Sequence, residues 1–239
     1  EGKVIILVNG TPFVLIAPVV FMHFFQTAED YYARFYLASA IRFLRVLSVM
    51  ITLLAPSIYI ALTTFHQEML PTRLLTNLAA QREGVPFPAF VEAVMMEVTF
   101  EILREAGIRM PRAVGQAVSV VGAIVIGQAA VEAGIVSAAM VIVVSITAIS
   151  SFVIPSYSIA NSIRLLRFPM MIFAGSFGFF GVMLALFALT IHLCSLKSFG
   201  ISYMAPLSPF HLRDQRDTFI RTIKSYFSSK GETLEKSRK

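Results

Sequence analysis

Two neighbouring apolar segments decide the fold of this chain: AVGQAVSVVGAIVIGQAAV at residues 113–131 and VSAAMVIVVSITAISSFVI at residues 136–154. Between Arg112 and Arg164, Glu132 is the single charged residue. A helix rises about 1.5 Å per residue, so each segment has close to the roughly 20 residues that cross the hydrocarbon layer of a membrane. The pair predicts two membrane-spanning helices joined by a turn at Glu132.

The composition of the whole chain agrees with this interpretation. Of the 239 residues, 56% are hydrophobic and 14% are charged, which lies outside the ordinary range of soluble domains. The net charge is +6, but the basic residues mostly flank apolar segments, where anionic lipid headgroups attract them. We therefore expect an integral membrane protein that has membrane lipids as partners and does not bind nucleic acid.

Two further apolar runs predict spans. Residues 46–65 carry no charge, and Pro56 within them removes one helix hydrogen bond, which predicts a kink. Residues 169–196 are also free of charge. The expected fold is an all-α integral membrane protein with about four transmembrane helices plus amphipathic and interfacial helices. Four spans place both termini on one side, and the basic residues near the two ends favour the cytoplasmic side.

The N-terminal residues have the pattern of a β-hairpin. Short runs rich in Val and Ile flank Asn9-Gly10, a pair that favours a type I′ turn. A lone hairpin is marginally stable in water, so we expect residues 1–26 to be the end of a soluble domain that lies upstream. Residues 27–212 would form the helical membrane domain, and residues 213–239 a basic cytoplasmic tail.

Several basic residues are expected at the level of the lipid headgroups. Thr27-Ala-Glu-Asp resembles a capping box, so a helix should begin at Thr27 and continue into the first span. Its aromatic rings and its arginines, Arg42 and Arg45 among them, are typical of a membrane boundary. Arg164 and Arg167 are expected to anchor a short interfacial helix in the same way.

Residues 89–106 predict an amphipathic helix that lies in the membrane plane, and partial re-entry of this helix into the membrane, which would change the number of spans, remains open. Residues 86–88, Pro-Phe-Pro, set an extended lead-in before it, and Gly107 is expected to end it. The two faces of this helix differ in polarity. The apolar face holds Val91, Val94, Met95, Val98 and Ile102, and the other face holds Glu97, Glu101 and Glu105.

Three interpretations of the glutamate stripe remain open. The acids could form a solvated face or pair with Arg104, Arg109 and Arg112, or they could gather cations at a channel mouth. A metal or catalytic site is the third possibility. Because no histidine or cysteine lies near the stripe and the chain has no nucleophile, phosphate-loop or zinc motif, we expect no enzyme activity, no cofactor and no bound metal.

The segment 113–131 carries polar side chains within an apolar helix. Small residues suit close helix packing in a membrane, while a buried amide needs a partner or water. Steps of four residues align Gln116, Val120, Ile124 and Gln128. Either the two glutamines bond to other helices, or copies of this helix surround a wet pathway whose waist at Val120 and Ile124 closes by dewetting.

Longer motifs carry a resemblance to a known family. They are EDYY at 29–32, PFP at 86–88, EVTFEILREAGIRMP at 97–111, VGAIVIGQAAV at 121–131 and SFGISY at 198–203. Together they resemble the A subunit of the spore germinant receptors, the GerA family, over nearly the whole chain. A sister family of spore-membrane proteins shares the same architecture.

The resemblance implies a place in the inner spore membrane and a set of partners. Such A subunits occur with a transporter-like B subunit that senses the nutrient and with a lipoprotein C subunit, and they are thought to form a pentameric homo-oligomer that conducts ions. Carried to this chain, residues 113–131 line the pore. The segment before them acts as a lever or mouth, with Pro86, Pro88, Glu97, Glu101, Glu105 and Arg109 as its candidate residues.

Two functional hypotheses follow. The first is a subunit of an oligomeric nutrient-gated cation channel that triggers germination. The second is a membrane scaffold or signalling subunit that does not itself conduct, since packing explains the glycines and glutamines equally well.

Overall fold

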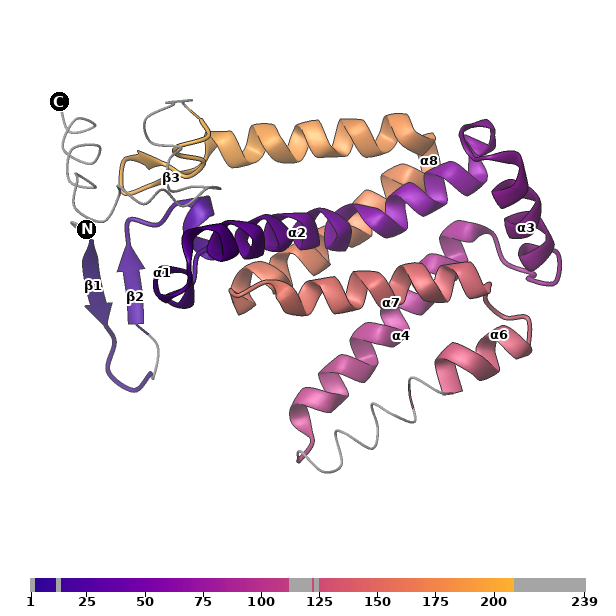
Figure 1. The fold of residues 1–239 in the computed structure, drawn as a ribbon, viewed down its shortest axis with the longest axis horizontal. Helices are drawn as coiled ribbons and strands as arrows, with labels where there is room; N and C mark the ends of the chain where they lie inside the picture. The colour runs from indigo at the N-terminus through magenta and orange to yellow at the C-terminus, as the bar shows by residue number, and fades with distance from the viewer. Residues whose placement is uncertain (1–2, 12–13, 112–121, 123–124, 209–239) are drawn as a thin grey trace. The chain divides into compact units, whose positions relative to one another are not determined.

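The computed structural model describes residues 3–11, 14–111, 122 and 125–208, and it is mostly helical (Figure 1). Two compact units make up the chain: Glu1–Leu47, Ile154–Ile159 and Phe187–Lys239 form the first, and Ser48–Val153 and Ala160–Leu186 form the second. The elements are, in order, β1 (Val4–Leu7), β2 (Val14–Ala17), η1 (Phe21–Phe25), α1 (Glu29–Tyr32), α2 (Phe35–Thr64), η2 (Gln67–Met69), α3 (Thr72–Arg82), α4 (Ala89–Arg109), η3 (Val125–Ala129), α6 (Ala130–Glu132), α7 (Ala138–Val153), α8 (Tyr157–Ser195), β3 (Lys197–Ser198) and β4 (Ile201–Ser202).

Two of the described helices, α2 and α8, are long and apolar enough to cross a membrane. The α2 helix begins well before the expected span and continues through Pro56. The α7 helix has 16 residues and is a shorter apolar helix. Most of the expected span at residues 113–131 lies outside the described residues. The count of four spans therefore stays a prediction.

The α8 helix differs from the expectation of a short interfacial helix followed by a separate straight span. One helix covers both, but Gly178 has φ 62° and ψ −142°, which is not helical. In a straight helix, residues 173 and 181 would lie about 12 Å apart, whereas a Cβ added at Gly181 would collide with the carbonyl oxygen of Phe173. The chain therefore turns sharply at Gly178 and divides α8 into two arms, residues 157–177 and 179–195.

The N-terminal hairpin is confirmed, with a different turn. Strands β1 and β2 pair antiparallel, with Val4 opposite Ala17. The Thr11 N–H and hydroxyl both donate to the Val8 carbonyl, and Gly10 has φ 85°. A type I′ turn would need a positive φ at Asn9 as well, and Asn9 does not have one. The positive φ at the third turn position is that of a type II turn.

A second small hairpin, β3–β4, follows α8. Phe199 and Gly200 form its two-residue turn, with φ of 50° and 84°. Residues far apart in the chain meet here: the Phe21 N–H donates to the Tyr203 carbonyl at 2.8 Å, and the Tyr203 ring lies 6.0 Å from the Phe21 ring. This contact joins η1 to the residue that follows β4, within the first unit.

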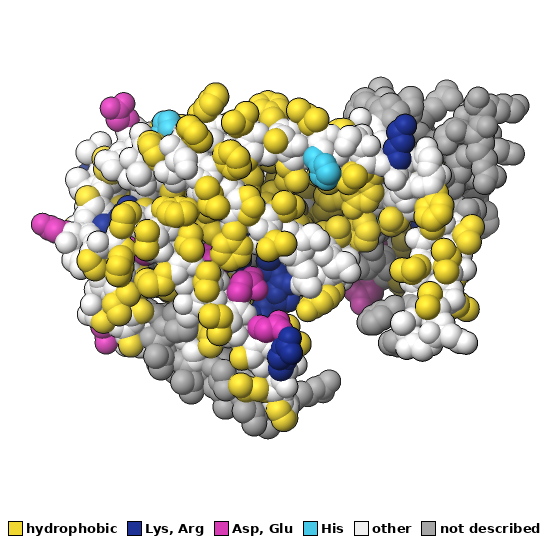
Figure 2. Space-filling model, turned by 180° about the vertical axis from the view of Figure 1, so that it is seen from behind, with side chains coloured by type: hydrophobic (Ala, Val, Ile, Leu, Met, Phe, Trp, Pro, Cys, Tyr) yellow, Lys and Arg dark blue, Asp and Glu magenta, His cyan; other side chains and the backbone are white. Residues whose placement is uncertain are grey.

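The second unit buries small and flexible apolar residues where its helices pack. Ala93 and Met96 of α4 and Met140 and Val144 of α7 are buried, and α4 and α7 are in contact. Many large apolar side chains remain exposed along α2, α7 and α8. Figure 2 shows hydrophobic side chains gathered over much of one face. Such a surface is unusual for a protein surrounded by water.

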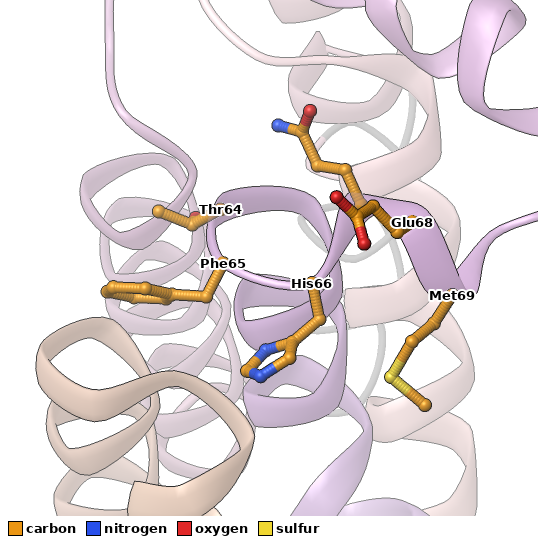
Figure 3. Close-up of a pocket in the computed structure, with 6 residues that line it drawn as sticks. Thr64, Phe65, His66, Glu68 and Met69 are labelled. Carbon is orange, nitrogen blue, oxygen red and sulfur yellow. The ribbon is translucent and has the colours of Figure 1, made fainter.

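A hollow follows the end of α2 (Figure 3). All six of its lining residues come from one continuous stretch, Thr64 to Met69. The His66 ring meets the Phe179 ring edge-on at 6.3 Å, beside the turn of α8. Since ligand sites are usually built from several elements, we assign this hollow to packing around the turn at Gly178.

Candidate functional site

The inner face of α4 is acidic, which reverses the expected orientation of this helix. Glu92 and Glu97 are both 0% exposed, whereas Ile102, assigned to the apolar face, is 64% exposed. In an amphipathic helix at a water surface the acids would face outward. Of the interpretations left open for the stripe, a solvated face does not hold for Glu97; pairing with arginine does, but the partner is an arginine of α8.

The acids of α4 join a cluster of five charged residues that we call the Arg167 network: Glu97, Glu101, Arg104, Arg164 and Arg167. Arg167 Nη2 lies 2.7 Å from Glu97 Oε2 and 3.3 Å from Glu101 Oε1. Arg164 Nη1 and Arg104 Nη1 each lie 3.7 Å from Glu101 Oε2. Arg164 also donates to the Ala160 carbonyl and to Asn161 Oδ1. The network fixes α4 against the first arm of α8.

The expectation that Arg164 and Arg167 are headgroup anchors is wrong. They are 5% and 1% exposed, and they point into the second unit rather than toward a boundary. The sequence does contain a pattern from which these ion pairs could have been predicted. The two arginines are three residues apart on one helix face, and Glu97 and Glu101 are four apart on one face of another. Ionisable residues within a membrane usually pair with one another, so the two spacings could have been matched.

Glu92 makes a second buried polar contact, which the sequence analysis missed. Its Oε1 accepts hydrogen bonds from the N–H and the hydroxyl of Ser137, both at 2.5 Å. The Ser137 hydroxyl lies 3.5 Å from the Tyr59 hydroxyl. Ser137 directly precedes α7, so a carboxylate of α4 caps the start of that helix, where a negative charge is favourable.

The remaining candidate residues of the expected lever or mouth lie before the start of α4 and in its last turns. Pro88 is its N-cap with extended angles, as expected, and its carbonyl accepts the N–H of Glu92. The helix passes Gly107 and ends at Arg109, because Met110 precedes a proline and is extended. Glu105 and Arg109 form an exposed ion pair at 2.6 Å, as one interpretation of the stripe proposed. Pro86 lies in the loop before α4.

Of the predicted pore-lining residues, Gln116, Val120 and Ile124 lie outside the described residues, and Gln128 lies within η3, a π-helix. Gln128 is exposed, and its Nε2 donates to Glu132 Oε1 at 3.1 Å. This bond joins two polar side chains of one chain. Neither predicted role of Gln128, as a pore-lining residue or as an interhelical contact, is tested by it.

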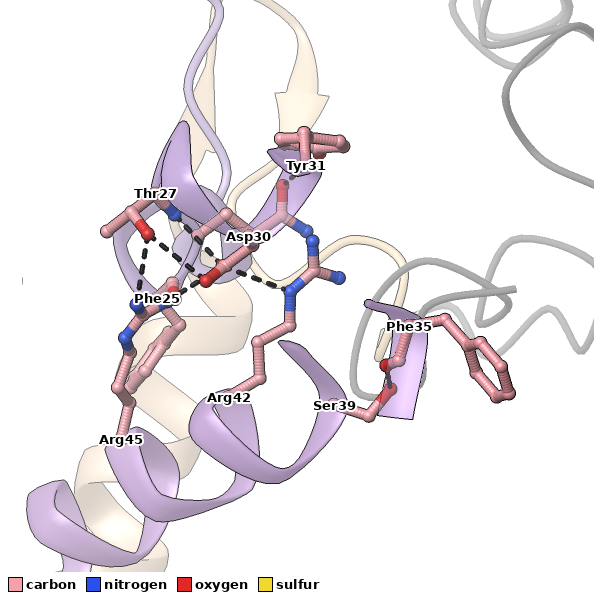
Figure 4. Close-up of polar contacts among 9 residues, drawn as sticks. Phe25, Thr27, Asp30, Tyr31, Phe35, Ser39, Arg42 and Arg45 are labelled. Carbon is pink, nitrogen blue, oxygen red and sulfur yellow. Dashed lines mark hydrogen bonds and ion pairs between the residues drawn. The ribbon is translucent and has the colours of Figure 1, made fainter. Parts of the chain in front are cut away.

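The first unit holds a separate buried cluster around Asp30 (Figure 4). Asp30 Oδ2 lies 2.7 Å from Arg45 Nη1 and 3.3 Å from Arg42 Nε, and it accepts the Thr27 N–H at 3.1 Å. Arg45 also donates to the Phe25 carbonyl and the Thr27 hydroxyl. Burial acts to raise the pKa of Asp30, but the hydrogen bonds from Arg45, Thr27 and Arg42 hold it below its usual value.

This cluster corrects two expectations. Arg42 and Arg45 are buried rather than set at a headgroup boundary. The acceptance of the Thr27 N–H by Asp30 is half of the expected capping box, but α1 ends at Tyr32 and Ala33 is extended. The arginines of α2 draw Asp30 toward them across this break, so the short α1 helix is held against the start of α2.

Both clusters join helices through buried ion pairs. Within the described residues, no group of three or more His, Cys, Asp or Glu could hold a metal ion. The acids of both clusters lie against arginines, and removing one partner of such a buried pair is strongly destabilising.

Comparison with known proteins places the chain among spore germination proteins. A family described as Bacillus/Clostridium GerA spore germination protein matches residues 1–232. The chain is 60% identical over 221 residues to spore germination protein KA of Bacillus subtilis (strain 168), a match that covers 92% of this chain and 41% of that protein. Spore germination protein GerLA of Bacillus cereus is 46% identical over 235 residues, covering 98% and 48%.

A membrane protein of Bacillus subtilis (strain 168) named YfkQ is 51% identical over 221 residues, covering 92% of this chain and 43% of that protein. The chain thus spans less than half the length of these curated relatives. No solved structure matches it.

Proposed function

Because the chain belongs to the GerA family of spore germination proteins, we propose that it is the membrane part of a germinant receptor A subunit, in which several copies form a nutrient-gated cation channel. The family membership and the names of the relatives support a role in spore germination. The channel itself is our proposal, and it assigns the chain no catalytic turnover.

The exposed pair Gln128–Glu132 carries the channel proposal. The two side chains bond to each other at 3.1 Å and are exposed at the end of a largely apolar segment. One mutual bond cannot satisfy all the donors and acceptors of an amide and a carboxylate, so the pair would be unfavourable in contact with lipid and favourable in contact with water. If Gln128 and Glu132 faced the axis of the oligomer, each copy would contribute the Glu132 carboxylate to a ring of negative charge, and such rings attract cations.

The proposal includes partners and a location. We expect the homo-oligomer, a pentamer by the family resemblance, to act with a transporter-like B subunit and a lipoprotein C subunit in the inner spore membrane. Both termini would lie on the cytoplasmic side. The nutrient would then bind a partner subunit and change the channel through the segment that contains α4.

Conductance of the full-length receptor tests the channel. The A subunit, purified with its B and C partners and reconstituted in vesicles, should pass cations when a nutrient that germinates the parent spores is added. Ile124→Ala should raise the flux without nutrient, because it widens the expected waist. Glu132→Gln should lower the preference for cations. Ile149→Ala, on the exposed face of α7, is the matched control and should leave both properties unchanged.

The scaffold hypothesis gives the opposite result. A complete receptor that binds nutrient but never conducts would refute the channel, provided that Ile124→Ala also leaves the cation flux unchanged. That result would favour a subunit that only transmits the signal.

A further inference from the structure

The contacts of α4 run along its whole length and set its direction relative to its neighbours in the second unit. Three contacts join it to the first arm of α8: Glu101 to Arg164, Glu97 to Arg167, and Phe90 to Gly175. The first two are ion pairs at 3.7 and 2.7 Å. In the third, a Cβ added at Gly175 would lie 2.8 Å from the Phe90 ring.

These contacts define an antiparallel register. Moving back along α4 from Glu101 to Phe90 covers eleven residues, and moving forward along α8 from Arg164 to Gly175 also covers eleven. The two helices therefore lie side by side over about 16 Å. All three contacts fit this one register.

The α7 helix accompanies α4 in the parallel direction. Near the start of α4, Glu92 accepts two hydrogen bonds from Ser137. Near its end, the Arg104 guanidinium lies 5.9 Å from the centre of the Phe152 ring. Helix α4 thus lies against two apolar helices along most of its length, and one of them is a candidate membrane span.

The polar groups of α4 face these neighbours, and its exposed face is apolar. Glu92 and Glu97 are fully buried, while the exposed residues of α4 before Glu105 are Val91, Val98 and Ile102. A helix in the hydrocarbon layer has this arrangement: its charged residues pair in the interior of the bundle, and its apolar residues face the lipid. The exposed charged residues of α4 are Glu105 and Arg109, in its last turns.

We propose that α4 crosses the membrane antiparallel to the first arm of α8, with its exposed apolar face in contact with lipid acyl chains. The inference rests on the membrane location in the proposed function. The 21 residues of α4 are about 32 Å long, enough for a hydrocarbon layer of roughly 30 Å. The acyl chains are favoured over a second copy because the exposed face continues onto α7, whose exposed residues Ile142, Ile146 and Ile149 are also apolar.

The proposal changes the path of the chain. An in-plane helix would leave its two ends on one side of the membrane, whereas a crossing helix places α3 and Met110 on opposite sides. The turn at Gly178 adds a second extra crossing, because it lets the apolar run of α8 return. Two added crossings preserve the parity of the spans, so both termini still lie on one side.

Thiol labelling of the full-length protein in sealed vesicles tests the crossing. Cys194 and any cysteine outside this sequence are first replaced by serine, and single cysteines are introduced as Thr76→Cys on α3 and as Met110→Cys, both at exposed positions. With a reagent that cannot cross membranes, we expect one position to be labelled before the vesicles are opened and the other only afterwards. Labelling of both from the same side would overturn the proposal.

Quenching by nitroxide-labelled lipids tests the lipid contact. A fluorophore at Ile102→Cys should be quenched by lipid nitroxides and protected from iodide, as should a reference at Ile172→Cys, on the exposed face of α8. If the reference is quenched but Ile102→Cys meets iodide, or is shielded from both quenchers by another protein surface, the proposal fails and the membrane location stands. If the reference is not quenched either, the membrane location itself fails, and the crossing fails with it.

Discussion

The Arg167–Glu97 ion pair offers the sharpest test of the structure, through the variant Arg167→Met. Methionine keeps much of the length of the arginine side chain but removes its charge. Glu97, which is fully buried, would lose its 2.7 Å partner. The second carboxylate, Glu101, keeps Arg104 and Arg164 as neighbours at 3.7 Å, so the main loss comes from Glu97.

Removing one partner of a buried pair leaves an uncompensated buried charge and costs about 3–5 kcal/mol. For a chain of this size, roughly 2–4 °C of melting temperature corresponds to each kcal/mol. We therefore expect Arg167→Met to lower the melting temperature of the detergent-solubilised protein by about 6–20 °C. Adding Glu97→Gln to the same chain should restore much of this loss, because the remaining buried group is then neutral.

The exposed pair Glu105–Arg109 is the matched control. It also joins a glutamate to an arginine, and both residues lie on α4, but the side chains of Glu105 and Arg109 are 59% and 77% exposed. Arg109→Met should cost no more than about 0.5 kcal/mol. A melting temperature of Arg167→Met that equals that of Arg109→Met, or a double variant that is less stable than the single one, would refute the assignment of a buried charge pair.

Three further predictions concern other parts of the chain. Gly178→Ala should destabilise the protein by about 1–3 kcal/mol in thermal unfolding, because φ is positive and the new Cβ would lie 2.8 Å from Phe65 Cβ, whereas Gly84→Ala, with open space around it, should have little effect. Ser137→Ala should cost about 1.5–3 kcal/mol by the same measurement, since it removes a hydroxyl donor from a buried carboxylate. The lowered pKa of Asp30 means that its contribution is complete above the unfolded-state pKa and is lost as pH falls through the folded-state pKa. The stability difference between the wild type and Asp30→Asn should therefore be constant from about pH 5 to 8 and shrink only below about pH 4.

Local rules predicted the elements that local sequence controls. The β-branched runs around Asn9-Gly10 form strands, and Pro88 precedes the first residue of α4. The ion pair of Glu105 with Arg109 was also foreseen, because residues four apart on a helix are neighbours. The turn in the hairpin was predicted less well, since Asn-Gly permits more than one turn type.

The break in α8 could not be predicted from its composition. Gly175, Gly178 and Gly181 look alike in the sequence, and any of them suits close helix packing. The turn falls at Gly178, where Phe65 and His66 from the end of α2 occupy the space that a side chain would need. That contact comes from residues more than a hundred positions away, so only the tertiary structure selects the glycine.

The sequence by itself determined the family, the apolar segments and the two unlike faces of α4. It did not determine which face of α4 points inward. Amphipathicity only shows that the two faces differ, and the acidic face turns toward water or toward the interior according to where its partners lie. Arg164 and Arg167, some sixty residues further along the chain, are brought beneath Glu97 and Glu101 by the packing of α8. Because an ion pair depends on distance in space and not along the chain, the tertiary structure decided that the charges of this helix are buried.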